Sequence, residues 1–439
     1  MRKRLLVITV IFSAILLFVT CQQKKTHEII SPVLVSKYAR PLTNIHFASS
    51  PQRLQRGQYL VNGVLRCFHC HAAVDTTKPG WPPIPGQLGS GRALFTSDSF
   101  HLCAPNITPD KETGAGSWTD DMFARAIRDG IGHDGRALIV MPYWVFKDAG
   151  DEDLASVIVY LRSIPAIKNK LPVRLFSPEF EKVLQNEVRT VADAPVPQPD
   201  TSTDLAKGRY LVRIGECIGC HTAWYKRNPG FFGGGNIIAN GGTDSVIVSA
   251  NISSDITGIG GWDDETFIRV IRTGKGGLLH RSMPWVSLKN MSDDDLKAIL
   301  VALKSTNPVE HSIVNGTKPS LCEACGQYHG YGDHNKIKPI IPVKVNTSLY
   351  SSYLGTYVTS YHDTIIISLK KDKTLWVTTV GEGTNTMELI PIAANKFNAS
   401  GLPSPISFTT NASGTVTGLV DYNLDPATFI KTQQKLAHR

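Results

Sequence analysis

The sequence predicts a mainly α-helical fold of two similar domains in tandem, followed by a small all-β C-terminal domain of antiparallel, barrel-like form. Three observations support this: an internal repeat, capped segments with helical spacing of apolar residues, and a C-terminal stretch rich in β-branched residues. The expected parts are a leader at 1–21, the first repeat at 50–165, a linker at 166–202, the second repeat at 203–310, a cysteine-containing linker at 311–344 and a β domain at 345–435.

The internal repeat is the main evidence for two related domains. Each copy opens on a Gly-x-Tyr-Leu-Val stretch and then carries a Cys-x-x-Cys-His motif, and later landmarks recur in the same order. The paired segments are 56–61 with 207–212, 67–71 with 217–221, 106–108 with 251–253, 118–121 with 262–265, 126–130 with 270–274 and 141–144 with 283–286. We therefore expect both copies to share one fold.

Helices are expected at matching places in the two copies. Thr119 and Asp263 are good N-cap residues, and Gly130 and Gly274 stand where a glycine ends a helix. A further helix closes each copy, and its leucine, isoleucine and valine residues recur at helical spacing.

The chain changes character from about Val345 onward. Runs rich in β-branched and aromatic residues cover 364–369, 374–379 and 405–410, and turn-forming stretches separate several of them. This pattern predicts antiparallel hairpins. The stretch resembles the small β domains appended to serine β-lactamase-like exported proteins.

The two Cys-x-x-Cys-His motifs carry the chemistry. Two such thiols form thioethers with the vinyl groups of heme, and the adjacent histidine binds the iron. Zinc would need further ligands at matched spacing, and disulfides would not explain the histidine after each pair. We therefore expect two covalently attached hemes c. The attachment residues are Cys67, Cys70, Cys217 and Cys220, and the iron ligands are His71 and His221.

The sixth iron ligand is expected to be a methionine. Met141 and Met283 lie at matching repeat positions, each before a proline that can hold the side chain in a loop. A His/Met pair raises the potential of a heme into the range of electron carriers. The alternatives are that both methionines pack in the core, or that His101, His133 or His280 is the ligand.

Four cysteines lie outside the motifs. Cys322 and Cys325 lack the following histidine, so we expect no third heme there. A disulfide between them fits an oxidising compartment; the alternatives are a metal site with His329 and His334, or a degenerate heme motif. Cys103 has no obvious partner. Cys21 belongs to the leader.

The N-terminus resembles a bacterial lipoprotein signal. Basic residues precede an uncharged apolar run over 5–20 that is short for a membrane span and stops at Cys21. The resemblance implies lipidation at Cys21; an ordinary cleaved signal peptide and an uncleaved anchor are the alternatives. All three place the protein on the periplasmic side of a bacterial membrane.

Charge argues against a nucleic-acid partner. The formal charge of +9 includes three basic residues of the leader, and the propionates of two hemes would lower it further. The remaining basic residues are spread along the chain rather than concentrated in a patch.

The run from Asn106 to Asp120, with Met141 to Tyr143 after it, resembles the cytochrome c subunits of membrane-bound bacterial alcohol and gluconate dehydrogenases. The resemblance covers roughly residues 50–310. It implies class I cytochrome c domains with His71/Met141 and His221/Met283 as iron ligands, and a dehydrogenase partner whose electrons pass to the respiratory chain. Those subunits typically carry three hemes; here the β domain stands in place of the third.

Three functions follow from these features. The first is an exported diheme cytochrome that relays single electrons between a periplasmic dehydrogenase and the respiratory chain, with no catalysis of its own. The second is a heme enzyme with one exchangeable axial site, such as a diheme peroxidase or a sulfur-compound dehydrogenase. The third is a binding module in the β domain, with the hemes as its redox sensor.

Overall fold

The computed structural model describes residues 34–432 except 79, 190–194, 225–226, 241–245, 276–281, 337–340, 360–363, 381–385, 400–404 and 422–426. The expected leader, with Cys21, lies outside the described residues. Within the part that is described, none of the helices combines the length and apolar character that a membrane span requires.

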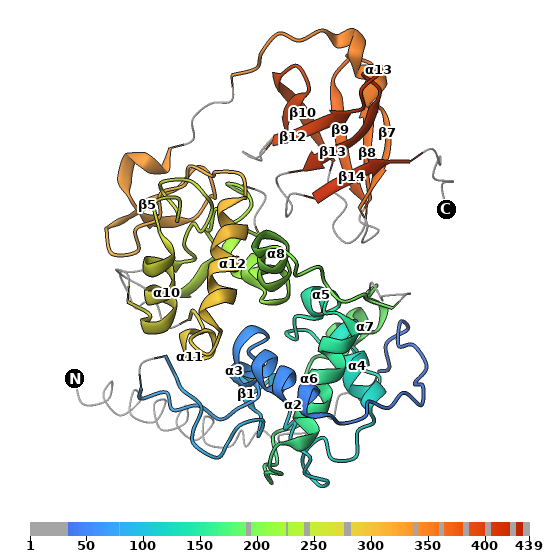
Figure 1. Ribbon diagram of the computed structural model, residues 1–439, viewed down its shortest axis with the longest axis vertical. Helices are drawn as coiled ribbons and strands as arrows, with labels where there is room; N and C mark the ends of the chain where they lie inside the picture. The colour runs from blue at the N-terminus through green and yellow to red at the C-terminus, as the bar shows by residue number, and fades with distance from the viewer. Residues whose placement is uncertain are drawn as a thin grey trace, which may run out of the picture.

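The first repeat consists of short helices joined by long loops and one hairpin (Figure 1). Its elements are α2 (Pro51–Tyr59), the π-helical turn η1 (Leu60–Val64), α3 (Cys67–Cys70), β1 (Arg92–Ser97), β2 (Phe100–Ala104), α4 (Asp120–Asp129), α5 (Tyr143–Phe146) and α6 (Asp151–Ser163). Helix α7 (Pro178–Asn186) follows it.

The second repeat has the same order of helices and strands, without a counterpart of η1 among its described residues. These are α8 (Asp204–Ile214), α9 (Cys217–His221), β3 (Ile237–Asn240), β4 (Val246–Val248), α10 (Asp264–Thr273), α11 (Trp285–Leu288) and α12 (Asp293–Lys304). A hairpin of β5 (Pro319–Leu321) and β6 (Tyr328–Gly330) and the turn η2 (Gly332–Asn335) follow.

The predicted caps of α4 and α10 are confirmed. The Thr119 side chain accepts a hydrogen bond from Met122 N, and Asp263 accepts one from Thr266 N. Gly130 and Gly274 end the two helices with φ values of 63° and 62°, a left-handed conformation that glycine adopts without strain.

The opening and closing helices of each repeat cross at very close range. A Cβ added at Gly57 of α2 would collide with the Ser156 carbonyl oxygen of α6, and one at Gly208 of α8 would collide with the Ala298 carbonyl oxygen of α12. Glycine at these two positions is therefore a packing requirement, since a larger residue would push the helix backbones apart.

The two repeats share one apolar core. Leu60 and Ile158 of the first repeat and Ile214 and Leu300 of the second are almost fully buried in a single hydrophobic cluster. Polar contacts bridge the same junction: the Tyr210 hydroxyl donates to Asp153 at 2.7 Å, and the Tyr59 hydroxyl donates to Asp295. The repeats therefore exchange equivalent tyrosine–aspartate contacts.

The C-terminal part is a closed antiparallel barrel with its own core. Its strands are β7 (Gly355–Val358), β8 (Thr364–Leu369), β9 (Leu375–Val380), β10 (Thr386–Ala393), β11 (Lys396–Ala399), β12 (Pro405–Thr410), β13 (Val416–Asp421) and β14 (Ala427–Lys431). Pairing of β14 with β7 closes the ring. The turn η3 (Thr347–Leu349) and helix α13 (Tyr350–Tyr353) precede β7, and Tyr353, Phe397 and Phe408 pack inside. The barrel lies at one end of the molecule, beyond the second repeat (Figure 1).

The predicted mainly α fold of two tandem cytochrome c domains is wrong. The structure is only 30% helical, with 12 α-helices among its described residues and eight strands in the barrel. Several helices, such as α3 and α5, are a single turn, and the Gly- and Pro-rich segments between them form loops and hairpins. The helical periodicity identified the long helices but carried no information on these stretches. The shared core also joins the two repeats rather than separating them.

We expect Gly57→Ala to destabilise the helical part by about 1–3 kcal/mol or more, because the new methyl group forces the α2 and α6 backbones apart. Denaturant unfolding followed by the helical circular dichroism signal measures this. Gly63→Ala is the matched control, since its added Cβ would meet its nearest neighbour, Met291 Cγ, at an ordinary 3.4 Å. Equal loss of stability in both variants would contradict the close-crossing explanation.

Candidate heme-attachment sites

Both Cys-x-x-Cys-His motifs occupy short helices with the same entry. The residue before each first cysteine, Arg66 or Glu216, has a positive φ of 56° or 57°. This left-handed residue is uncommon outside glycine and asparagine. It turns the chain from the opening helix into the motif helix, so that α3 and α9 start in the same way.

The two motif histidines are held identically. The His71 Nδ1 atom lies 2.8 Å from the Pro105 carbonyl oxygen, and the His221 Nδ1 atom lies 2.8 Å from the Ala250 carbonyl oxygen. A carbonyl only accepts, so each ring donates through Nδ1 and keeps the lone pair of Nε2 for a metal. This is the tautomer and orientation that an iron-binding histidine needs.

Two repeated asparagines position the loops that hold these histidines. Asn106 donates to the Ile167 carbonyl and Asn251 to the Val309 carbonyl, each at 2.7 Å. Both loops are thereby tied to the chain that leaves the closing helix. The sequence showed that these asparagines recur, but not what they do.

Two glycines also serve the motifs and were missed in the sequence. Gly91 N donates to the His71 carbonyl at 3.0 Å, and Gly234 N donates to the His221 carbonyl at 2.7 Å. Both have a positive φ, 75° and 68°. The only sequence signal was that each lies in a glycine-rich stretch before a hairpin.

Met141 and Met283 sit in matching tight turns. Tyr143 N donates to the Met141 carbonyl and Trp285 N to the Met283 carbonyl, both at 2.8 Å. The prolines between them have φ/ψ of −80°/55° and −78°/55°, close to an inverse γ-turn. Both methionines are half-buried against the shared core that Cys67 and Cys217 also contact.

The burial of each motif favours neutral side chains. Desolvation raises the pKa of Cys67 to about 12 and that of Cys217 to about 11, and lowers the pKa of His71 and His221. Neutral imidazole is the form that binds iron. All four motif cysteines are free thiols, as attachment to heme requires. The donor set therefore fits a covalently attached heme in each repeat.

An ion pair joins the two motifs across the junction between the repeats. Arg66 Nη2 lies 2.9 Å from a carboxylate oxygen of Glu216, and both side chains are largely shielded from solvent. These residues are the N-caps of α3 and α9, so the two motif helices meet at their N-termini. The two Cys-x-x-Cys-His motifs therefore lie next to each other.

The alternative axial histidines have other roles or fall outside the described residues. The backbone of His101 in β2 pairs with Leu175, and the His133 ring stacks on Trp118 with the centroids 4.4 Å apart. His280 lies outside the described residues. These contacts give His101 and His133 structural explanations.

The expected disulfide between Cys322 and Cys325 does not form. Both are free and fully buried thiols. They lie with His329, as the alternative metal site required, but the fourth member of the group is His311 rather than His334. Cys103 is a half-buried free thiol in β2.

Several curated relatives of this chain are named as cytochrome subunits of dehydrogenases. The cytochrome c subunit of a quinone alcohol dehydrogenase from Gluconobacter oxydans is 28% identical over 278 residues, which cover 57% of this chain and 54% of that protein. Over this part, the chain is similar to cytochrome c subunits.

Two further relatives are also named as c-type cytochromes. The gluconate 2-dehydrogenase cytochrome c subunit of Pantoea cypripedii is 30% identical, covering 57% of this chain and 59% of that protein. A diheme cytochrome of Cereibacter sphaeroides is 27% identical, covering 36% and 53%. The chain thus spans little more than half the length of these relatives, and no family model matches it. The resemblance to dehydrogenase cytochrome c subunits is confirmed.

We expect Arg66→Glu to destabilise the contact between the repeats by up to about 3 kcal/mol, because two shielded carboxylates would then face each other. The double variant Arg66→Glu/Glu216→Arg restores the opposite charges and should recover most of that loss. Denaturant unfolding of the four members of this cycle gives the coupling energy. A double variant no more stable than Arg66→Glu would show that the pair contributes nothing.

Proposed function

We propose that this protein is an exported diheme c-type cytochrome that relays single electrons between a periplasmic dehydrogenase and the respiratory chain. The observation that carries the proposal is the matched pair of Cys-x-x-Cys-His motifs, joined start to start by Arg66 and Glu216. The homology to cytochrome c subunits supports the class of function.

Each repeat contributes one attachment site to the proposal. Cys67 and Cys70 hold one heme with His71 as proximal ligand, and Cys217 and Cys220 hold the other with His221. When bound, such a group supplies a one-electron iron couple. The chain's own part is to fix the imidazole through Nδ1 and to bury both motifs.

Met141 and Met283 are proposed as the distal ligands. Their matching γ-turns hold the backbone of each methionine in one conformation, which limits the freedom of a side chain that is otherwise flexible. A fixed thioether on each iron leaves no open position, so the proposal assigns no catalytic residue.

The partners and location belong to the same proposal. We assign a dehydrogenase as electron donor and a respiratory cytochrome or oxidase as acceptor, and place the protein on the periplasmic side of a bacterial membrane, lipid-anchored through Cys21. The relatives support a redox partner because their names describe subunits of dehydrogenases. The domain boundaries 50–165, 203–310 and 345–435 remain part of the proposal.

Absorption spectroscopy of protein matured with heme in a periplasm tests the function. We expect two covalent hemes per chain, low-spin in both oxidation states, and no spectral shift with carbon monoxide, because both axial positions are filled. A high-spin heme that binds carbon monoxide readily would overturn the electron-carrier proposal in favour of a heme enzyme with one exchangeable axial site.

Substitution of the methionines tests the distal ligands one at a time. Met141→Ala should open one heme to carbon monoxide and roughly halve the thioether-to-iron absorption band, and Met283→Ala should do the same at the other heme. Met122→Ala in α4 is the matched control and should leave the spectrum unchanged. An unchanged band in Met141→Ala would mean that another residue is the ligand in the first repeat.

A further inference from the structure

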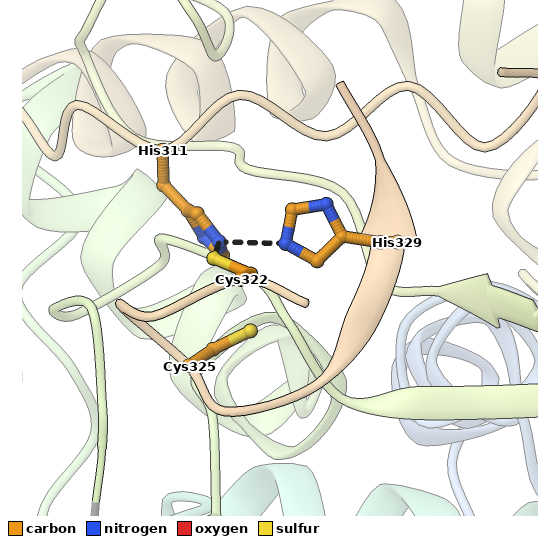
Figure 2. Close-up of side chains that lie close together, drawn as sticks. All are labelled: His311, Cys322, Cys325 and His329. Atoms are coloured by element: carbon orange, nitrogen blue, oxygen red, sulfur yellow. Dashed lines mark hydrogen bonds between the residues drawn. The ribbon is translucent and has the colours of Figure 1, made fainter. Parts of the chain in front are cut away.

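Four metal-ligating side chains meet after the second repeat. They are His311, Cys322, Cys325 and His329, and their ligand atoms all lie within 4.8 Å of one another (Figure 2). His311 is 3% exposed and the other three are 0% exposed. Each comes from a separate position on the chain between α12 and η2, so the fold brings them together.

Two separations between ligand atoms are close to those around a tetrahedral metal. The two histidine Nε2 atoms are 3.1 Å apart, and His311 Nε2 is 3.3 Å from Cys322 Sγ. Zinc bonds of about 2.0–2.1 Å to nitrogen and about 2.3 Å to sulfur place neighbouring ligand atoms of a tetrahedron about 3.3–3.8 Å apart. These two separations are therefore close to those that one zinc ion sets, and all four ligand atoms lie within 4.8 Å of one another.

The orientation of both rings directs lone pairs to the same point. His311 Nδ1 lies 2.6 Å from the Gly233 carbonyl oxygen, and His329 Nδ1 lies 3.1 Å from the Gly330 carbonyl oxygen. Since carbonyls only accept, each ring donates through Nδ1 and turns the lone pair of Nε2 toward the other ring and the sulfurs (Figure 2). A shared cation resolves the repulsion between two such lone pairs, and the Nδ1 contacts fix the rings for it.

The backbone around the two cysteines forms a compact turn. Gly326 N donates to the Cys322 carbonyl at 2.7 Å, and Cys322 N donates to the Gln327 carbonyl at 2.8 Å. Gly326 has a φ of 71°, which explains a glycine directly after the second cysteine. Gly235 (φ 111°) packs on the cluster, where an added Cβ would lie 3.1 Å from Cys325 Cβ.

We propose that His311, Cys322, Cys325 and His329 bind one structural zinc ion. A Cys₂His₂ set suits zinc, and four buried protein ligands leave no open position for catalysis. With two thiolates the bound ion forms a neutral site, which suits burial. Copper and iron in place of zinc are outcomes of the test below.

The position of the cluster indicates what the zinc ion stabilises. The His311 ring donates a hydrogen bond to the Gly233 carbonyl. The next residue, Gly234, donates a backbone hydrogen bond to the carbonyl of His221, the proposed heme ligand. The ion therefore pins the segment between the second repeat and the barrel onto the loop beside the second heme motif. Its loss should disturb the second heme site and leave the first one in place.

Metal analysis of the full-length protein carrying its hemes tests the proposal. Elemental analysis should find about one zinc per chain beside the heme iron, falling below about 0.1 in Cys322→Ser and His329→Ala. Cys103→Ser and His334→Ala are the matched controls and should keep the zinc, since neither residue belongs to the cluster. Loss of zinc from the controls as well, or its retention in Cys322→Ser, would overturn the assignment.

X-ray absorption at the zinc edge decides the question on the wild-type protein, so the test does not depend on the variants folding. We expect two sulfur neighbours at about 2.3 Å and two nitrogen neighbours at about 2.0 Å. Zinc with only oxygen and nitrogen neighbours, another metal on these four ligands, or an intact mass lower by the two hydrogens of a Cys322–Cys325 disulfide would each overturn the proposal.

Discussion

The hydrogen bond from each motif histidine to a backbone carbonyl is the interaction around which each repeat is arranged. In the proposed heme sites, the two thiols and the imidazole of one motif serve one rigid macrocycle, so the imidazole ring needs a fixed orientation. The Pro105 and Ala250 carbonyls fix it, and Asn106 and Asn251 fix the loops that present those carbonyls. These loops are therefore organised parts of the proposed heme-attachment sites.

The close crossing of the opening and closing helices also positions the polar contacts between the two repeats. Because Gly57 and Gly208 let these helices touch, the aspartates near the start of α6 and α12 come within reach of both repeats. Asp153 binds Arg56 of its own repeat at 2.8 Å and Tyr210 of the other at 2.7 Å. Asp295 pairs with Lys207 at 3.3 Å and with Tyr59 in the same way. The first and second repeats thus make equivalent contacts across the junction, as expected where a repeated unit packs against its own copy.

The sequence predicted the features that depend on neighbouring residues and missed those that depend on distant ones. The N-caps and the terminal glycines of α4 and α10 follow from a few adjacent residues, and the structure has them. The predicted fold class failed because helical spacing is informative only where the chain is helical. The described loops and hairpins between α3 and α4 and between α9 and α10 have no such pattern. The ion pair between Arg66 and Glu216 links residues 150 positions apart. Nothing in the sequence around either motif indicates this contact.

The cysteine-rich linker shows the same limit at one site. The alternative metal site predicted from the sequence combined Cys322, Cys325 and His329 with His334, which is near them in the chain. In the structure the fourth member is His311, which is near them in space. The His311 ring reaches the cluster because its Nδ1 atom bonds to Gly233, in the loop that also supports His221. Residues 233 and 234 therefore serve two sites at once: one carbonyl orients a proposed zinc ligand, and the next amide holds the backbone of a proposed iron ligand. A loop under two such constraints has little freedom to move, so the proposed second heme site is supported from outside its own repeat. Among the described residues, no comparable cluster supports the first proposed heme site.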